Sequence, residues 1–306
     1  MKERKNKIQE SIHILNSSNE YKVLKRVPEK LEKRESKGKI FKTAFIDLET
    51  TGLEPRQDEI IEIGLLITSF TNEDGFINID YTDNQLQQPS KPISKEITRI
   101  TGITNEDVKD KKIDWHLLKD KIQNVDLIVC HNAYFDRNFM ELQTPKFFGS
   151  LIESKSFACS SNGIDWLDLG YEGSKLEYLN LKMGYFYEGH RALIDCYATL
   201  NLFASNPKAF EKLKEKARQK EFLICAVNAS FDKKDQLRNR GYRWSNGNNT
   251  LPKSWWTIVP EKKYEEELKF LKNRIYEREV LDLPTKVITA KERYSYRGER
   301  LENLTK

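Results

Sequence analysis

The chain has 306 residues, of which 38% are hydrophobic and 32% are charged, and its formal net charge is +5. This length suits about two domains and allows a packed core. No apolar run approaches the roughly 20 residues of a membrane span, and the polar N-terminus has no signal-peptide core. The sequence therefore excludes a membrane protein and predicts a soluble globular protein of the cytoplasm.

The charge is distributed unevenly along the chain. Residues 1–42 contain 13 basic and 6 acidic side chains, residues 43–206 contain 15 and 26, and residues 207–306 contain 24 and 15. An acidic centre with basic flanks fits a metal-dependent site acting on a polyanion that the flanks hold. Solvated lysine-rich helices would give the same pattern in the flanks.

The four cysteines lie roughly 30 residues or more apart and form no CxxC pair: Cys130, Cys159, Cys196 and Cys225. This spacing favours buried, reduced thiols over a zinc site or disulfides.

The first 206 residues divide into an arm and a domain. Residues 1–40 are polar and basic, with a weak helical pattern that predicts one loosely packed helix. Residues 41–206 alternate strand and helix patterns, which predicts a mixed α/β sheet. Strands are expected at Phe41–Glu49, Ile60–Thr68, Phe76–Tyr81 and Leu127–Cys130, and helices at Asp114–Gln123, Asp136–Leu142, Leu176–Met183 and Ala192–Phe203. The turn Asn72-Glu73-Asp74-Gly75 is a strong hairpin signal.

The remaining third is predicted to be a helical linker at 207–221, a small basic α+β domain at 222–280 and a basic tail at 281–306. The small domain has the order β-α-β-β-α. Asp232 is expected to cap its first helix, Gly241 to end that helix, and Pro260 to begin the last one.

Asp47-Leu48-Glu49-Thr50-Thr51-Gly52 follows a short apolar run and is typical of a strand end. Side chains alternate along a strand, so Asp47 and Glu49 project to the same side. Two neighbouring carboxylates repel each other unless a cation neutralises them, and hard cations such as magnesium prefer carboxylate oxygen. A solvated strand end with two surface acids is the alternative.

Two later segments favour the metal site. In Cys130-His131-Asn132-Ala133-Tyr134-Phe135-Asp136 a strand ends and a helix begins with an acid. In the segment that begins at His190, Asp195 lies on an otherwise apolar helix, where an acid is rarely buried without a partner.

The ordered set Asp-x-Glu-Thr-Thr-Gly, His-Asn-x-x-Phe-Asp and His-x-x-x-x-Asp resembles the DEDDh 3′–5′ exonucleases, most closely the proofreading subunits of bacterial replicative polymerases. The resemblance covers residues 41–206 and implies an RNase H-like fold that removes nucleotides from 3′ ends with two divalent cations, Mg²⁺ or Mn²⁺. It implies that the metal ligands are Asp47, Glu49, Asp136 and Asp195 and that His190 is the general base. A related subclass has tyrosine where this chain has Arg191, so the histidine subclass fits.

The resemblance also implies a set of substrate-binding residues: Thr50, Thr51, Leu53, Asn132 and Phe135. Such chemistry is reasonable because two cations about 3.5–4 Å apart can activate a water and stabilise a leaving oxygen. An imidazole with a pKa near ~6.5 can accept the proton of that water.

The function expected is therefore exonuclease action on single-stranded or frayed DNA, in proofreading or repair, with a DNA polymerase or repair complex as a possible partner. RNA trimming and a non-enzymatic single-strand-binding scaffold are the alternatives. In the small domain, Tyr242, Trp244, Trp255 and Trp256 lie near basic residues and could stack on bases, or they could form its core.

Overall fold

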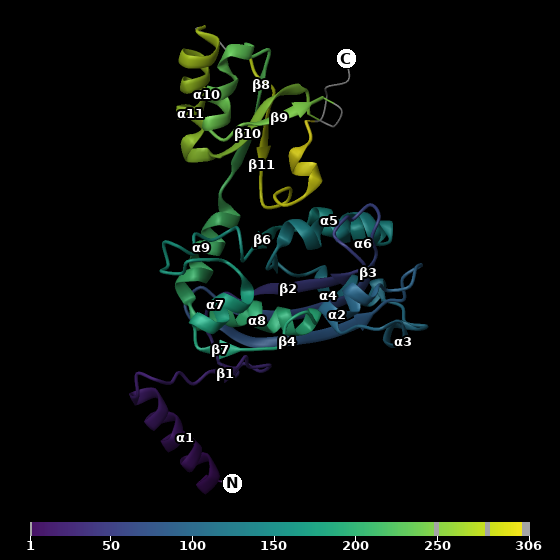
Figure 1. Cartoon of the computed structure of the whole chain (residues 1–306), viewed down its shortest axis with the longest axis vertical. Helices are drawn as coiled ribbons and strands as arrows, with labels where there is room; N and C mark the ends of the chain where they lie inside the picture. Colours follow the sequence, from purple (N-terminus) through teal and green to yellow (C-terminus); the bar gives the residue numbers. More distant parts are fainter. Residues whose placement is uncertain (1, 248–250, 279–281, 302–306) are drawn as a thin grey trace. The chain divides into compact units, whose positions relative to one another are not determined.

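The structure, a computed structural model, describes residues 2–247, 251–278 and 282–301 (Figure 1). The chain folds into two compact units. The first contains the chain up to Thr51 together with Ile60–Ile113 and Ile164–Phe210, and the second contains Gly52–Glu59, Asp114–Gly163 and the chain from Glu211 onward. The domain boundaries expected from sequence stay predictions. Met1 of the predicted arm, and residues 281 and 302–306 of the predicted tail, lie outside the described residues.

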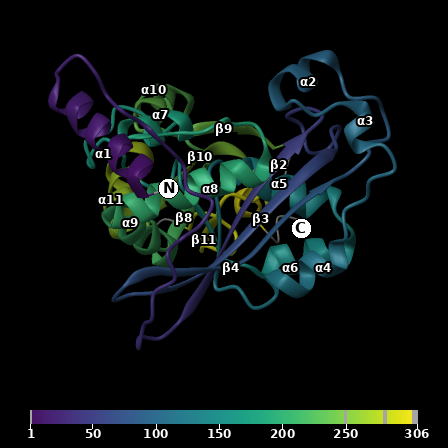
Figure 2. The ribbon, with the colours of Figure 1, turned by 90° about the horizontal axis from the view of Figure 1, so that it is seen from below.

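Three neighbouring antiparallel strands in the order β4-β3-β2 form the centre of the first unit (Figure 2). The strands are β2 (Phe41–Thr50), β3 (Ile60–Thr71) and β4 (Gly75–Leu86). β2 and β3 are slightly longer than the predicted runs, whereas β4 is twice as long as predicted because it continues to Leu86. β3 is buried along its whole length, in keeping with its largely apolar sequence. Gly75 has a φ of +69° in the turn between β3 and β4, which confirms the predicted hairpin.

Helix α8 (Ala192–Ser205) packs on β2 and β3 at close range. The approach depends on Gly64 in β3, because a Cβ there would overlap the backbone of Ala192 and Leu193. The Cys196 thiol donates to the carbonyl oxygens of Phe45 and Gly64, at 3.4 and 3.5 Å. This glycine therefore fixes the start of α8 against the sheet.

The other elements of this unit are the N-terminal helix and several short helices and strands. The predicted arm helix is present as α1, and the strand after it pairs in parallel with a strand before α8, with Lys25 opposite Tyr185. No helix in the described part of the chain is both long and apolar enough to cross a membrane. These elements are α1 (Lys2–Ser17), β1 (Lys25–Arg26), α2 (Lys95–Thr101), α3 (Asn105–Val108), α7 (Leu176–Lys182) and β7 (Tyr185–Phe186).

The second unit begins with a parallel strand pair, in which Ile128 of β5 lies opposite Phe157 of β6. Asp114 caps the predicted helix α4 by accepting from the backbone N–H groups of His116 and Leu117. Antiparallel and parallel pairing thus both occur in the chain. The bounds are α4 (Trp115–Ile122), β5 (Leu127–Cys130), α5 (Ala133–Gln143), α6 (Lys146–Ser154) and β6 (Phe157–Cys159), and α9 (Pro207–Arg218) runs from the first unit into the second.

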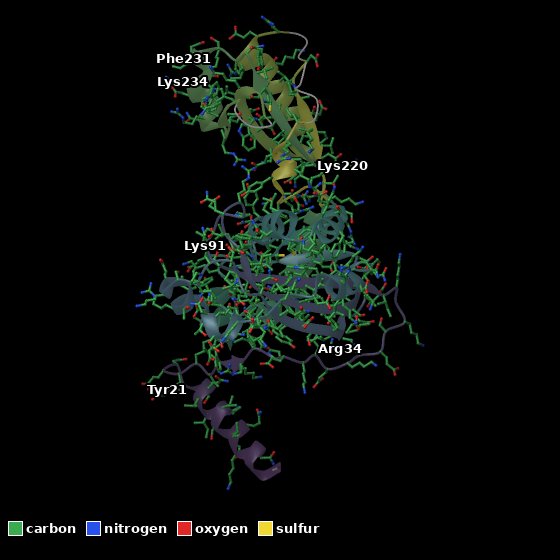
Figure 3. The ribbon with its side chains drawn as sticks, turned by 90° about the vertical axis from the view of Figure 1, so that its right-hand side faces the viewer. Tyr21, Arg34, Lys91, Lys220, Phe231 and Lys234 are labelled. Atoms are coloured by element: carbon green, nitrogen blue, oxygen red, sulfur yellow. The ribbon has the colours of Figure 1, made fainter. Side chains whose placement is uncertain are left out.

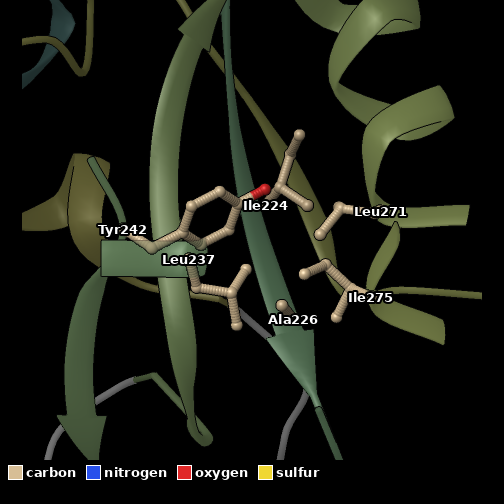
Figure 4. Packing of buried hydrophobic residues seen from close by; sticks show 6 residues of the cluster. All are labelled: Ile224, Ala226, Leu237, Tyr242, Leu271 and Ile275. Carbon is tan, nitrogen blue, oxygen red and sulfur yellow. The ribbon is translucent and has the colours of Figure 1, made fainter. Parts of the chain in front are cut away.

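The C-terminal module, which we define as residues 221–276, contains the predicted β-α-β-β-α order, and β11, which follows the module in the chain, adds a fourth strand to its sheet. Together they form an antiparallel sheet in the order β11-β8-β10-β9. One face of β8 packs against the helices through Ile224 and Ala226 (Figure 4), and the other face contributes Leu223 and Cys225 to a second cluster. The bounds are β8 (Glu221–Val227), α10 (Lys234–Asn239), β9 (Arg243–Asn246), β10 (Lys253–Pro260), α11 (Glu261–Phe270) with a π-helical turn at Leu271–Tyr276, and β11 (Thr285–Ile288).

The predicted cap at Asp232 is wrong. A 3₁₀ turn at Phe231–Lys233 precedes α10, and Ser230 occupies its cap position, with its hydroxyl bonded to the Asp232 carboxylate. Gly241, with a φ of +87°, ends the helix as predicted, and Pro260 directly precedes α11.

The segment after β11 is tied to α5. Arg137 of α5 is completely buried, and its guanidinium donates to the carbonyl oxygens of Ala290, Lys291 and Arg293, at 3.1, 2.5 and 3.0 Å. Its Nε lies 2.7 Å from the Glu141 carboxylate. Residues 289–297 are therefore an integral part of this unit, whereas from sequence they were expected only as part of a basic tail.

Candidate active site

Asp47 and Glu49 lie near the end of β2 and share one face of the strand. Both are half-buried, whereas Ile46, Leu48 and Thr50 between and beside them are buried. A register shift follows, because Glu49 pairs with Glu62 but Thr50 pairs with Ile60. Such an irregularity increases the local twist of a strand, and it is common beside functional sites.

Asp195, in the first turn of α8, joins these two acids. One carboxylate oxygen of each of Asp47, Glu49 and Asp195 lies within 4.8 Å of the others. Three hard oxygen donors at this separation suit a divalent cation of the magnesium type, and their mutual repulsion favours binding one. The residues present therefore fit the metal centre that the motifs imply.

Burial raises the pKa of Asp195 to about 6. The nearby His190 and the backbone N–H of Arg191, which donates to Asp195 Oδ2 at 3.2 Å, oppose this rise. The Tyr187 hydroxyl also donates to Asp195, and burial followed by the charge of Asp195 raises the pKa of that tyrosine. Sequence reasoning missed Tyr187, whose only signal was its position three residues before His190.

His190 is exposed and has a φ of +64° immediately before α8. This left-handed conformation costs a non-glycine residue about 1 kcal/mol, so the surrounding structure must impose it. Its exposure leaves the imidazole open to proton exchange with water.

Glu62 of β3 holds the chain beside His190. Its carboxylate is fully buried and accepts from Arg191 Nη2 at 2.7 Å and from the backbone N–H of Ala192 at 2.9 Å. The hydrogen bond to Glu62 raises the pKa of Arg191. Because Glu62 lies within a largely apolar strand, its sequence position indicated that it has a buried partner. The sequence did not show that this partner is Arg191.

Asp136 is buried in the first turn of α5, in the second unit. Its grouping with Asp47, Glu49 and Asp195 stays a prediction. Beside it, Phe135 packs on Phe139 with ring centroids 4.8 Å apart, and Asn132 is exposed at the start of the helix.

The loop after β2 presents Leu53, which is 79% exposed. The Asp58 carboxylate accepts from the backbone N–H of Glu54 at 2.9 Å, and a Cβ on Gly52 would lie 2.5 Å from it. Glycine therefore allows this tight turn. Thr50 is buried and Thr51 half-buried, so of the predicted substrate-binding residues Leu53 and Asn132 are the ones in the exposed class.

Residues 44–203, more than half of the chain, match the sequence model of the RNase_T family, which is described as an exonuclease family. The chain belongs to this exonuclease family. The match confirms the family resemblance seen in the motifs and the RNase H-like, mixed α/β fold that it implies.

The exonuclease is 34% identical over 176 residues to a "DNA polymerase III PolC-type" of Thermotoga petrophila, covering 55% of this chain and 12% of the polymerase. It is 33% identical over 177 residues to an uncharacterized exonuclease of Escherichia phage 186, covering 52% of this chain and 84% of that protein. A structure of exonuclease X in complex with 5′-overhanging duplex DNA overlaps 57% of this chain and 98% of its own, at 23% identity and a TM-score of 0.41. The chain thus spans only about an eighth of the polymerase relative.

Proposed function

We propose that this exonuclease removes nucleotides one at a time from the 3′ ends of single-stranded or frayed DNA, in proofreading or repair. The observation that carries the proposal is the three-carboxylate group Asp47, Glu49 and Asp195, with His190 just before the helix that carries Asp195. The naming of relatives as DNA polymerases supports DNA as the substrate. The alternative substrate is RNA.

In this proposal Asp47, Glu49, Asp136 and Asp195 hold two divalent cations, Mg²⁺ or Mn²⁺. When bound, such ions lower the pKa of a water and stabilise the charge that develops on the leaving oxygen. The carboxylates position the ions and offset their charge. His190 accepts the proton of the attacking water, for which its exposed position before α8 is suitable.

The proposed contacts to the terminal nucleotide come from Thr50, Thr51, Leu53, Asn132 and Phe135. Leu53 and Phe135 offer apolar surface to a base or sugar, and the exposed Asn132 amide offers hydrogen bonds.

The test is an assay on a 5′-labelled single-stranded DNA oligonucleotide and on its RNA counterpart, with Mg²⁺ or with EDTA. We expect a ladder of DNA products shortened from the 3′ end, lost with EDTA and lost in Asp47→Asn. Asp120→Asn, at an exposed acid of α4, is the matched control and should keep wild-type activity.

Three results would count against the proposal. Unchanged activity in Asp47→Asn would show that the active site is not at Asp47. Faster shortening of RNA than of DNA would show that RNA is the preferred substrate. Tight binding of single strands without shortening, in Mg²⁺ and in Mn²⁺, would favour a scaffold instead of an enzyme.

A further inference from the structure

A cleft of about 750 Å³ in the second unit has no role in the mechanism above. Three separate parts of the chain line it: the loop after β2, the start of α5, and the C-terminal module with its following segment. Its main side chains are Arg56, Tyr134, Trp244, Trp256, Tyr296 and Arg300. A volume of this size is ordinary for a site that takes a small molecule or a nucleotide.

The aromatic rings of the cleft are held in place but keep exposed surface. Tyr134 and Tyr296 meet edge to face with centroids 5.5 Å apart, and Trp244 meets Trp255 in the same way at 5.5 Å. Trp244 nevertheless remains 47% exposed and Tyr134 39% exposed. Large rings with one open face at the wall of a cleft are suited to stacking, because their position is already fixed.

The charges of the cleft are mixed. The Arg56 guanidinium lies 5.7 Å from the Tyr296 ring centroid, and Arg300 also lines the cleft and is exposed. Glu54 and Glu299 also line the cleft, so it is not a purely cationic phosphate-binding site. A ligand with a flat, hydrogen-bonding ring and one or two phosphates matches this combination better than a polyanion alone.

We propose that this cleft binds an unpaired nucleobase of the single-stranded substrate, with the base stacked on Trp244 and its flanking phosphates near Arg56 and Arg300. The inference rests on the proposed function for its substrate. Tyr134 lies two residues before Asp136 on α5, so the cleft and a proposed metal ligand share one helical turn. The C-terminal module thereby contributes to a second binding site for the strand that the exonuclease shortens.

A comparison within the module provides the control. Phe231 is 79% exposed and has the Lys234 ammonium 4.1 Å from its ring centroid. Both residues, which are labelled in Figure 3, lie outside the lining of the cleft. Phe231→Ala therefore removes an exposed aromatic ring beside a cation without touching the cleft.

The experiment measures binding of fluorescently labelled oligonucleotides to the full chain by anisotropy in EDTA, where no shortening occurs. The probes are a 12-nucleotide oligo-dT, the matching oligo-rU, and a 12-unit deoxyribose phosphate tract without bases. We expect Trp244→Ala to raise Kd for oligo-dT about tenfold, which is typical of one lost base–aromatic stack. The same variant should not change Kd for the abasic tract, and Phe231→Ala should change Kd for oligo-dT less than twofold.

Equal affinity of Trp244→Ala and wild type for both oligo-dT and oligo-rU would overturn the inference, and so would an equal loss on the abasic tract. Trp244→Phe should recover most of the affinity, which separates stacking from misfolding. An effect on oligo-rU alone would assign the cleft to RNA and contradict the substrate proposed here. Because binding is measured without metal, loss of shortening in Asp47→Asn is independent of this result, and the two proposals can fail separately.

Discussion

Replacement of Arg137 by alanine should loosen the segment that follows β11. The side chain is completely buried, and the change removes its ion pair with Glu141 and its hydrogen bonds to three backbone carbonyls. Removing one partner of a buried pair typically costs about 3–5 kcal/mol, because the groups left behind have lost their compensation. That is a large share of the roughly 5–15 kcal/mol of a typical domain.

The assay is hydrogen exchange and limited proteolysis of the full chain, read at residues 289–297. Arg137→Ala should speed exchange there by at least a hundredfold at neutral pH, while Arg99→Ala, at an exposed position of α2, should leave it unchanged. An exchange rate at residues 289–297 of Arg137→Ala that stays within threefold of the wild-type rate would refute this prediction. Arg137→Lys keeps a charge but not the fork of donors, so an intermediate result is expected.

Three further outcomes follow from the packing. Gly64→Ala should displace the start of α8, because the added Cβ would overlap the backbone of Ala192. The affinity for the metal ion, measured by calorimetry, should therefore fall at least tenfold. An unchanged affinity would contradict the close packing of α8 on β3. Glu62→Gln keeps the shape of the side chain but removes the charge that pairs with Arg191, so the melting temperature should fall by several degrees. A rise would show that burying the Glu62 charge costs more free energy than its ion pair and hydrogen bonds contribute. Burial raises the pKa of Glu141, but hydrogen bonds from Arg297, Ser295 and Arg137 lower it, and the net result is a pKa below 4.5. The ionised Glu141 therefore stabilises the fold above pH 4.5, and this contribution is lost as the pH falls through the lowered pKa. Proteolysis of the C-terminal segment should therefore increase in acid, and Glu141→Gln should flatten that pH dependence.

The sequence was sufficient for the carboxylates because their chemistry restricts residue type and spacing. Asp47 and Glu49 could be placed on one strand face from period-two alternation alone, and Asp195 stood out as an acid on an apolar helix. The structure brings those three together, whereas Asp136 lies in the other unit and its place in the group stays a prediction.

The features that escaped prediction depend on contacts between residues far apart in the chain. β11 has only four residues, two polar and two apolar, and such a short run does not identify the partner strand β8. Arg137 looks like an ordinary helix-surface cation until the carbonyls of residues 290–293 are known to surround it. The cap at Asp232 failed for a local reason, since Ser230 two residues earlier can begin a 3₁₀ turn equally well.

The hydrogen bonds of Arg137 also have a consequence for the order of events during synthesis. The carbonyls that surround this guanidinium belong to residues made about 150 positions later. Until those residues leave the ribosome, Glu141 is the one partner of this guanidinium, among those described above, that has already been made, and its remaining donors must stay solvated. The helix that bears Asp136 would then reach its final packing only after residues 290–293 have been made.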